Sequence, residues 1–154
     1  MSGDEWSTPP WLFDYYNREY KFNLDAAANK ENTKCTEFFS KEDNSLAQSW
    51  EEKRVWCNPP YSRAGGPLTA WVAKAIREVK DASYHELVAM LIPADTSTQY
   101  FKLCWECAYS IHFWHRIKFV GAPSSAKFGS MVVIFNSQRG LRPKIKVLRK
   151  TDIF

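Results

Sequence analysis

The stretch Val55-Trp56-Cys57-Asn58-Pro59-Pro60-Tyr61-Ser62 decides how the rest of the chain is interpreted. Residues 55–57 are a short apolar run that predicts a strand, and two prolines end it because they lack the N–H donors of a ladder. Asn58 and Tyr61 would then follow the carboxyl end of this strand, where ligands bind in open α/β sheets. An ordinary Asn-Pro turn has the same letters, so the surrounding sequence has to decide.

The composition indicates one globular domain. The chain has 154 residues, of which 45% are hydrophobic and 25% charged, so a packed core is expected and global disorder is not. Aromatic residues make up 16% and the net charge is +4, which is compatible with a nucleic-acid partner. No apolar stretch approaches membrane-spanning length and residues 1–10 do not resemble a signal peptide, so we expect a cytoplasmic protein with no membrane contact.

The N-terminal part predicts a leader and a capped helix. Residues 1–7 are expected to be flexible, and residues 8–154 to form a single domain. Thr8-Pro9-Pro10 opens a helix in which Thr8 is the N-cap and Pro9 takes the first helical position. A helix N-terminus favours an anionic ligand, although a well-capped helix alone explains the same residues.

Two acids follow at places where a strand or turn ends. Residues 21–25 predict a strand that ends in Asp25, and the small Ala26 and Ala27 behind it would let a ligand approach the backbone. Residues 36–39 predict a short strand, and a polar turn with Asp43 comes next. A strand followed by a helix start, and a helix-capping acid, explain these acids equally well.

Hydrophobic periodicity predicts the remaining elements. Leu68–Val79 is the clearest helix, with Lys74, Arg77, Glu78 and Lys80 opposite its apolar face. Residues 87–92 suit a buried parallel strand, and residues 98–109 a second helix. Residues 110–120 and 130–136 are rich in β-forming residues, and the connection between them is too short for a parallel crossover, so we expect them to pair antiparallel. The predicted fold class is α/β with a mixed sheet.

The four cysteines do not point to a metal site. Cys104 and Cys107 form a C-x-x-C, but they follow the apolar spacing of the predicted helix and are interpreted as small core thiols. A structural zinc site needs four ligands, and no second paired motif occurs. The basic residues between Arg139 and Lys150 could contact phosphates, and a solvated edge strand explains them as well.

Three separated motifs occur in a fixed order: Thr8-Pro9-Pro10, then Leu24-Asp25-Ala26-Ala27-Ala28, then Asn58-Pro59-Pro60-Tyr61. Together with the later Arg116-Ile117-Lys118-Phe119, this order resembles the small phage-type DNA N6-adenine (Dam-like) methyltransferases over about residues 8 to 136. The resemblance implies a Rossmann-like fold, S-adenosylmethionine (SAM) as the only cofactor, and double-stranded DNA as substrate. It also implies a short target site such as GATC, and the host cytoplasm as location if a phage encodes the protein.

The resemblance assigns roles to single residues. Thr8 and Asp25 would hold the methionine part of SAM, and Asp43 its adenine. Pro9, Ala26 and Ala27 would also belong to the cofactor site. Asn58, Pro59, Pro60 and Tyr61 would form the catalytic loop. Ser62, Arg116 and Phe119 would contact the substrate.

The chemistry of adenine explains the loop. The exocyclic amine is a poor nucleophile because its lone pair is delocalised into the ring. The Asn58 side-chain oxygen and the Pro59 carbonyl can accept from the amine hydrogens, and consecutive prolines hold these acceptors in place. Tyr61 can stack on a base taken out of the duplex.

The chain also departs from related enzymes. No glycine lies between Gly3 and Gly65, so a glycine-rich cofactor loop is absent. No separate target-recognition domain fits, so residues 62–67, residues 121–130 and the basic tail would read DNA, in a monomer or a homodimer. The alternatives are an N4-cytosine methyltransferase, a protein glutamine methyltransferase, and a binding module that has lost activity.

Overall fold

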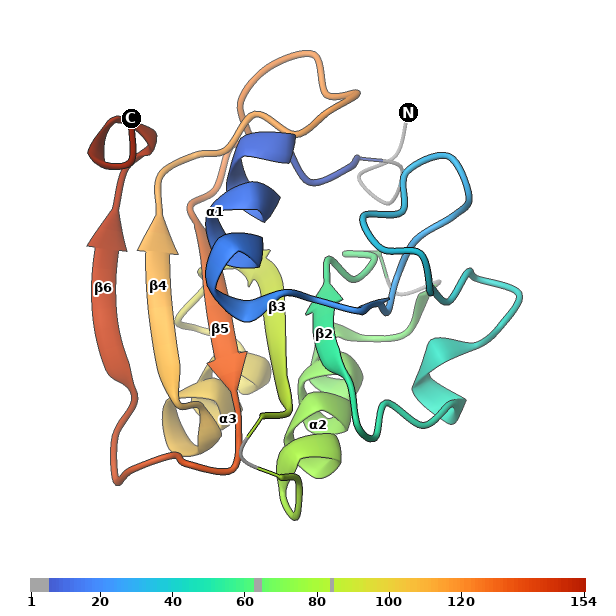
Figure 1. Ribbon diagram of the computed structural model, residues 1–154. Helices are drawn as coiled ribbons and strands as arrows, with labels where there is room; N and C mark the ends of the chain where they lie inside the picture. Colours follow the sequence, from blue (N-terminus) through green and yellow to red (C-terminus); the bar gives the residue numbers. More distant parts are fainter. Residues whose placement is uncertain (1–5, 63–64, 84) are drawn as a thin grey trace.

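The computed structural model describes residues 6–62, 65–83 and 85–154. Figure 1 shows its helices and strands in chain order: α1 (Pro10–Tyr20), β1 (Leu24–Asp25), β2 (Arg54–Cys57), α2 (Leu68–Val79), β3 (Leu87–Pro93), α3 (Gln99–Cys107), β4 (Ser110–Trp114), β5 (Ser130–Phe135) and β6 (Lys144–Leu148). Two short 3-10 turns, η2 (Ser45–Ala47) and η4 (Lys150–Asp152), precede β2 and follow β6. None of the helices in the described ranges is long and apolar enough to cross a membrane.

A six-stranded mixed sheet carries the fold, with the order β1-β2-β3-β5-β4-β6. β1, β2 and β3 are parallel, and β5 is antiparallel to both β3 and β4. The expected antiparallel pairing of residues 110–120 with 130–136 is therefore confirmed. The basic tail adds β6, an exposed edge strand that runs parallel to β4 because it reverses direction after β5 and lies beyond β4.

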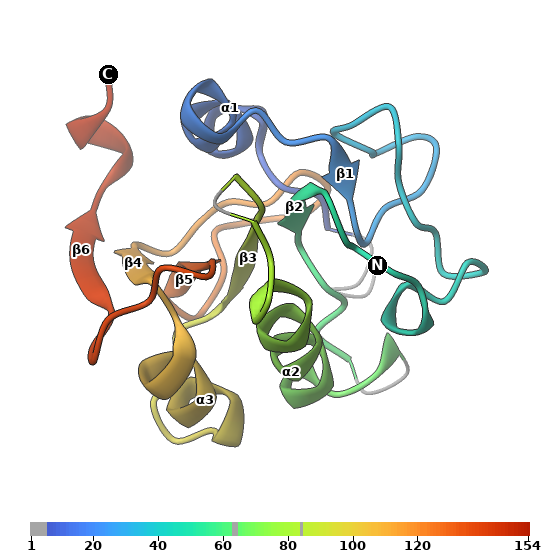
Figure 2. The same ribbon diagram turned by 60° about the horizontal axis from the view of Figure 1, so that its bottom comes forward.

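Helices cover both faces of the sheet. Figure 2 shows α1 on one side of it, and α2 and α3 on the other. Strand β2 serves both layers, because successive side chains point to opposite faces. Val55 and Cys57 belong to the core under α2 and α3, whereas Trp56 packs in the core under α1.

The start of α1 corrects the prediction for Thr8 and Pro9. Pro9 is the N-cap with ψ 139°, Pro10 is the first helical residue, and no side chain caps the helix. The second proline is the reason, since a residue that precedes proline is driven out of the α region into extended backbone. Pro9 therefore cannot be helical, and Thr8 lies too far from the helix to cap it.

The prediction that residues 1–7 form a flexible leader is wrong for Trp6 and Ser7. Ser7 pairs with Val120 through two backbone hydrogen bonds of 3.1 and 3.0 Å, and the Trp6 ring stacks on Phe119. Residues 1–5 lie outside the described residues. The segment Trp6–Thr8, hereafter the N-terminal strap, is thus tied to the loop that follows β4.

The strand predicted over residues 36–39 is reduced to a single parallel bridge between Asp25 and Phe38. Backbone bonds from Asp25 N to Glu37 O, and from Phe39 N to Asp25 O, nevertheless keep this segment extended beside β1. β1 itself has two residues, fewer than predicted. The segment therefore takes the edge position beside β1 without forming a ladder of its own.

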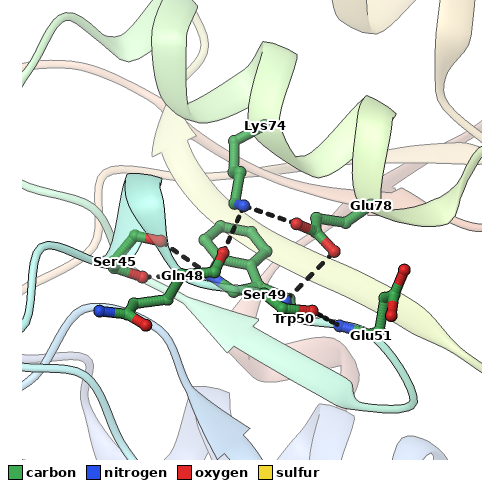
Figure 3. A network of polar contacts seen from close by, with 7 residues as sticks. All are labelled: Ser45, Gln48, Ser49, Trp50, Glu51, Lys74 and Glu78. Atoms are coloured by element: carbon green, nitrogen blue, oxygen red, sulfur yellow. Dashed lines mark hydrogen bonds and ion pairs between the residues drawn. The ribbon is translucent and has the colours of Figure 1, made fainter.

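Hydrophobic periodicity predicted that Lys74 lies on the exposed face of α2, and this prediction is wrong. Lys74 lies in a buried polar network. Only 6% of Lys74 is exposed. Figure 3 shows its ammonium group between the Glu78 carboxylate and the Gln48 carbonyl, while the other Glu78 oxygen accepts from Trp50 N. The loop before β2 covers this side of α2, which helical periodicity cannot reveal.

A second buried polar network joins α1 to the sheet. The Trp114 indole donates to the Tyr16 hydroxyl oxygen at 2.8 Å, and the Tyr16 hydroxyl lies 2.8 Å from His112 Nδ1. Because the indole can only donate, the Tyr16 proton is free for His112 Nδ1. Burial, and secondarily the charge of Lys146, lower the His112 pKa to about 4, which keeps the imidazole neutral as an acceptor.

We expect Tyr16→Phe to lower the free energy of unfolding by about 2 kcal/mol, because it leaves two buried polar partners, Trp114 Nε1 and His112 Nδ1, unsatisfied. Urea denaturation at neutral pH measures this loss. Tyr15→Phe is the matched control, since the Tyr15 ring also contacts Trp114 but its hydroxyl takes no part in this network. Equal stability of the two variants would contradict the prediction.

Candidate active site

The candidate site lies where β1 and β2 end side by side. The strands are parallel and neighbouring, with Asp25 opposite Trp56, so Asp25 and Asn58 emerge at the same edge of the sheet. A small cavity of about 30 Å³ lies between this edge and the N-terminal strap. It is lined by Trp6, Ser7, Thr8, Asp25, Ala27, Asn32, Lys34, Trp56 and Asn58.

Asp25 is the buried charge of this cavity, with 3% of the residue exposed. Its carboxylate accepts from Lys34 N at 3.0 Å and from Ala27 N at 3.4 Å. Burial raises its pKa to about 6, and the two amides and the Lys34 charge offset only part of that effect. A carboxylate with so little compensation is well suited to a cationic ligand group.

The structure adds five lining residues that sequence reasoning missed, namely Trp6, Ser7, Asn32, Lys34 and Trp56. Lys34 raises the positive potential near Asp25, but among the described residues no ion pair within 4 Å joins the two side chains. Asn32 and Lys34 belong to the turn after β1, which has no periodic pattern to mark it. Trp6 falls in the segment that is predicted to be flexible, and Trp56 in a predicted strand whose apolar pattern indicates only packing.

Asn58 begins the loop after β2, and its side chain reaches the strap. Its Nδ2 donates to the main-chain oxygen of Trp6 at 3.5 Å. Pro59 is buried and Pro60 half-buried behind it. Gly65 packs directly on this loop, because a Cβ at position 65 would lie 2.1 Å from the Pro60 Cγ. The acceptor end of the Asn58 amide is thereby presented from a rigid support.

Tyr61 is fixed by its hydroxyl and by two aromatic edges. The hydroxyl donates to Leu91 O at 3.1 Å, and burial raises the pKa of the phenol. The ring meets Phe119 edge-on, with centroids 6.3 Å apart, and Phe128 at 6.0 Å. The structure thus brings Phe119 and Phe128 next to Tyr61, and a contact of Phe119 with the substrate stays a prediction.

Other predicted residues lie apart from the cavity. Among the described residues, Asp43 is not part of the lining; it is exposed, and hydrogen bonds from the Ser40 backbone and side chain hold its pKa below the ordinary value. Ser62 and Arg116 are exposed, and Ala26 is fully buried with its N–H bonded to Trp56 O. Residues 63 and 64 of the predicted DNA-reading loop 62–67 lie outside the described residues.

No metal centre is seen in the described part of the chain, where no three His, Cys, Asp or Glu side chains come together. Cys104 is buried on α3, and burial raises its thiol pKa. The absence of a metal in the working protein stays a prediction.

The basic tail lies at the opposite edge of the sheet from the candidate site, as the positions of β6 and β1 in Figure 2 show. Strand β6 is largely exposed, and Lys150 lies over the Trp11 ring of α1 at 5.2 Å. Contacts of this tail with phosphates stay a prediction.

Comparison with known proteins gives a family and two similar phage proteins. Residues 1–153 match the sequence model of a family described as DNA N-6-adenine-methyltransferase (Dam). A protein of Escherichia phage T1 with the name DNA N-6-adenine-methyltransferase is 43% identical over 100 residues, which are 64% of this chain and 39% of that protein. A protein of the same name from Haemophilus phage HP1 (strain HP1c1) is 38% identical over 103 residues, 66% of this chain and 56% of that protein. The chain thus spans about half the length of these curated relatives or less.

A similar solved structure supports the fold alone. A chain from a type I R-M system superposes with a TM-score of 0.60 at 11% identity, covering 95% of this chain and 45% of that chain. The arrangement of helices and strands is therefore one already seen in a larger protein.

Proposed function

Since this chain belongs to the DNA N-6-adenine-methyltransferase (Dam) family, we propose that it transfers a methyl group from SAM to the N6 amine of adenine in DNA. The observation that carries the proposal is the meeting of Asp25 and Asn58 at the ends of two adjacent parallel strands. Asp25 supplies a buried carboxylate for a cationic ligand, and Asn58 supplies an amide in the same loop as Tyr61. We further propose that residues 8–154 form one methyltransferase domain with a Rossmann-like fold.

The residues around the cavity fit the amino-acid end of SAM, which carries an ammonium and a carboxylate. Asp25 would accept from the ammonium group, and the positive potential of Lys34 would favour the carboxylate. Thr8, which is buried in the strap, and the small Ala27 complete this part of the lining. Asp43 remains our candidate for the adenine end, although it would have to act from outside the cavity.

When bound, SAM supplies an electrophilic methyl group that is attached to a sulfonium. The sulfur leaves as a neutral thioether once the methyl group is transferred. The protein's own contribution is to orient the amine. Asn58 Oδ1 and the Pro59 carbonyl would accept from the two N6 hydrogens and so favour a more tetrahedral nitrogen. Tyr61 and Phe119 would pack against the extruded base.

Methylation of DNA by the purified chain, with nucleoside analysis of the product, tests the proposal. We expect N6-methyladenine in double-stranded DNA, and we expect it to form about 10²–10³-fold more slowly with Asn58→Ala under the same conditions. N4-methylcytosine or methylated glutamine in a protein substrate would replace the proposed substrate with one of the alternatives. Binding of DNA without any methyl transfer would replace the enzyme with a binding module. Paired duplexes with and without GATC test that candidate site.

A further inference from the structure

The two ends of the Asn58 amide have opposite hydrogen-bonding characters. Oδ1 accepts, whereas Nδ2 donates, so only one of the two flipped orientations can receive the hydrogens of an adenine amine. In the other orientation Nδ2 would face the N6 hydrogens, donor against donor. The proposed chemistry therefore needs something that selects the orientation before the base arrives.

The structure places such a partner on the strap. Asn58 Nδ2 donates to the main-chain oxygen of Trp6, a contact between residues 52 positions apart in the sequence. A carbonyl oxygen can only accept, so this contact is satisfied in one amide orientation alone. That orientation uses the donor end and leaves Oδ1 as the free acceptor.

Two anchors hold the Trp6 carbonyl at this place. The Trp6 ring stacks on Phe119, with centroids 6.2 Å apart and an interplanar angle of 27°. The following residue, Ser7, bonds Val120 through both its backbone groups. The indole Nε1–H is buried but has no hydrogen-bond partner among the described residues, so stacking, and not this donor, fixes the ring. Since Phe119 also contacts Tyr61, the same segment supports both sides of the site.

We propose that Trp6 is a positioning residue for the methyl transfer: its main-chain carbonyl orients the Asn58 amide with Oδ1 as acceptor, and its ring anchors that carbonyl on Phe119. The inference rests on the proposed function. It makes Trp6 act through Asn58, without contact to the reacting atoms.

The first test compares turnover in Trp6→Ala and Trp6→Phe. Loss of the ring removes one of the two anchors and loosens the Trp6 carbonyl. Trp6→Ala should therefore lower kcat by about three- to tenfold, the contribution of one hydrogen bond, while the KM for SAM changes little. Trp6→Phe keeps a stacking ring and should restore most of kcat. Trp11→Ala is the matched control, since Trp11 packs on Trp114 under α1, away from the site, and should leave kcat unchanged.

The second test removes the need for orientation. Asn58→Asp replaces the amide by a carboxylate, whose two oxygens both accept, so either oxygen can face the N6 hydrogens and the contact with the Trp6 carbonyl is already lost. In that background Trp6→Ala should lower kcat by less than about twofold, a clear departure from additivity. An equal loss in both backgrounds would mean that Trp6 acts on the base or on the fold, and would overturn the inference.

The third test is independent of activity. The side-chain amide resonances of Asn58, assigned by their disappearance in Asn58→Asp, should exchange with water more slowly than those of the exposed Asn29. In Trp6→Ala this protection should disappear, and in Trp11→Ala it should remain. Unchanged protection in Trp6→Ala overturns the inference even if the wild-type chain methylates adenine. A wild type without methyl transfer, but with protection lost in Trp6→Ala, overturns the proposed function and leaves the positioning contact standing.

Discussion

Replacing Asn58 by alanine should lower kcat by about 10²–10³-fold while the affinity for SAM stays unchanged. Removal of one preorganised polar contact to a developing charge costs about that much in other enzymes. The loss should fall on turnover because the acceptor matters most as the amine nitrogen becomes tetrahedral. Single-turnover methylation of a duplex measures the rate, and calorimetry with SAM measures the affinity.

Two further variants sharpen this result. Asn58→Asp keeps an acceptor and should recover part of the activity lost in Asn58→Ala. Tyr61→Phe is the matched control in the same loop: it loses the bond to Leu91 O but keeps the ring between Phe119 and Phe128, so kcat should stay near normal. Near-normal methylation by Asn58→Ala would remove Asn58 from the mechanism.

The elements that the sequence predicted well are those with local patterns. The helix predicted from the apolar positions between Leu68 and Val79 forms as α2, and β3 extends the predicted run 87–92 by one residue. A strand buried on both faces and an amphipathic helix each carry their packing in their own residues. The contact between Tyr61 and Phe119 could not be predicted from such a pattern, because the two residues lie on separate loops.

The errors concern residues whose environment is set by distant segments. Lys74 lies on the polar side of its helix, yet a loop that precedes β2 buries it beside Glu78 and Trp50. Trp6 belongs to a short polar segment, and only its pairing with the loop after β4 reveals it as part of the site. Such contacts between separate segments leave no periodic trace in one sequence.

The affinity for SAM should depend strongly on Asp25. Asp25→Asn removes the negative charge but keeps the side-chain shape, and we expect SAM to bind at least about 30-fold more weakly, as is typical when one member of a buried charge pair is lost. Turnover at saturating SAM should change much less, because Asp25 lies at the cofactor end of the site. Calorimetry measures the affinity, and unfolding of the variant in urea checks that its fold is intact.

The same carboxylate predicts a pH dependence of SAM binding. Burial raises the Asp25 pKa from 3.8 to about 6. An ammonium ligand binds the ionised form, so affinity should level off above about pH 7 and be about half its maximum near pH 6. Well below the pKa it should fall about tenfold for each pH unit, as long as the ligand amine stays protonated. His112, with its pKa lowered to about 4, titrates below this window and does not contribute. In Asp25→Asn the pH dependence of SAM affinity between pH 5 and 7 should vanish. If the variant kept this dependence, a group other than Asp25 would titrate and would contact the ammonium.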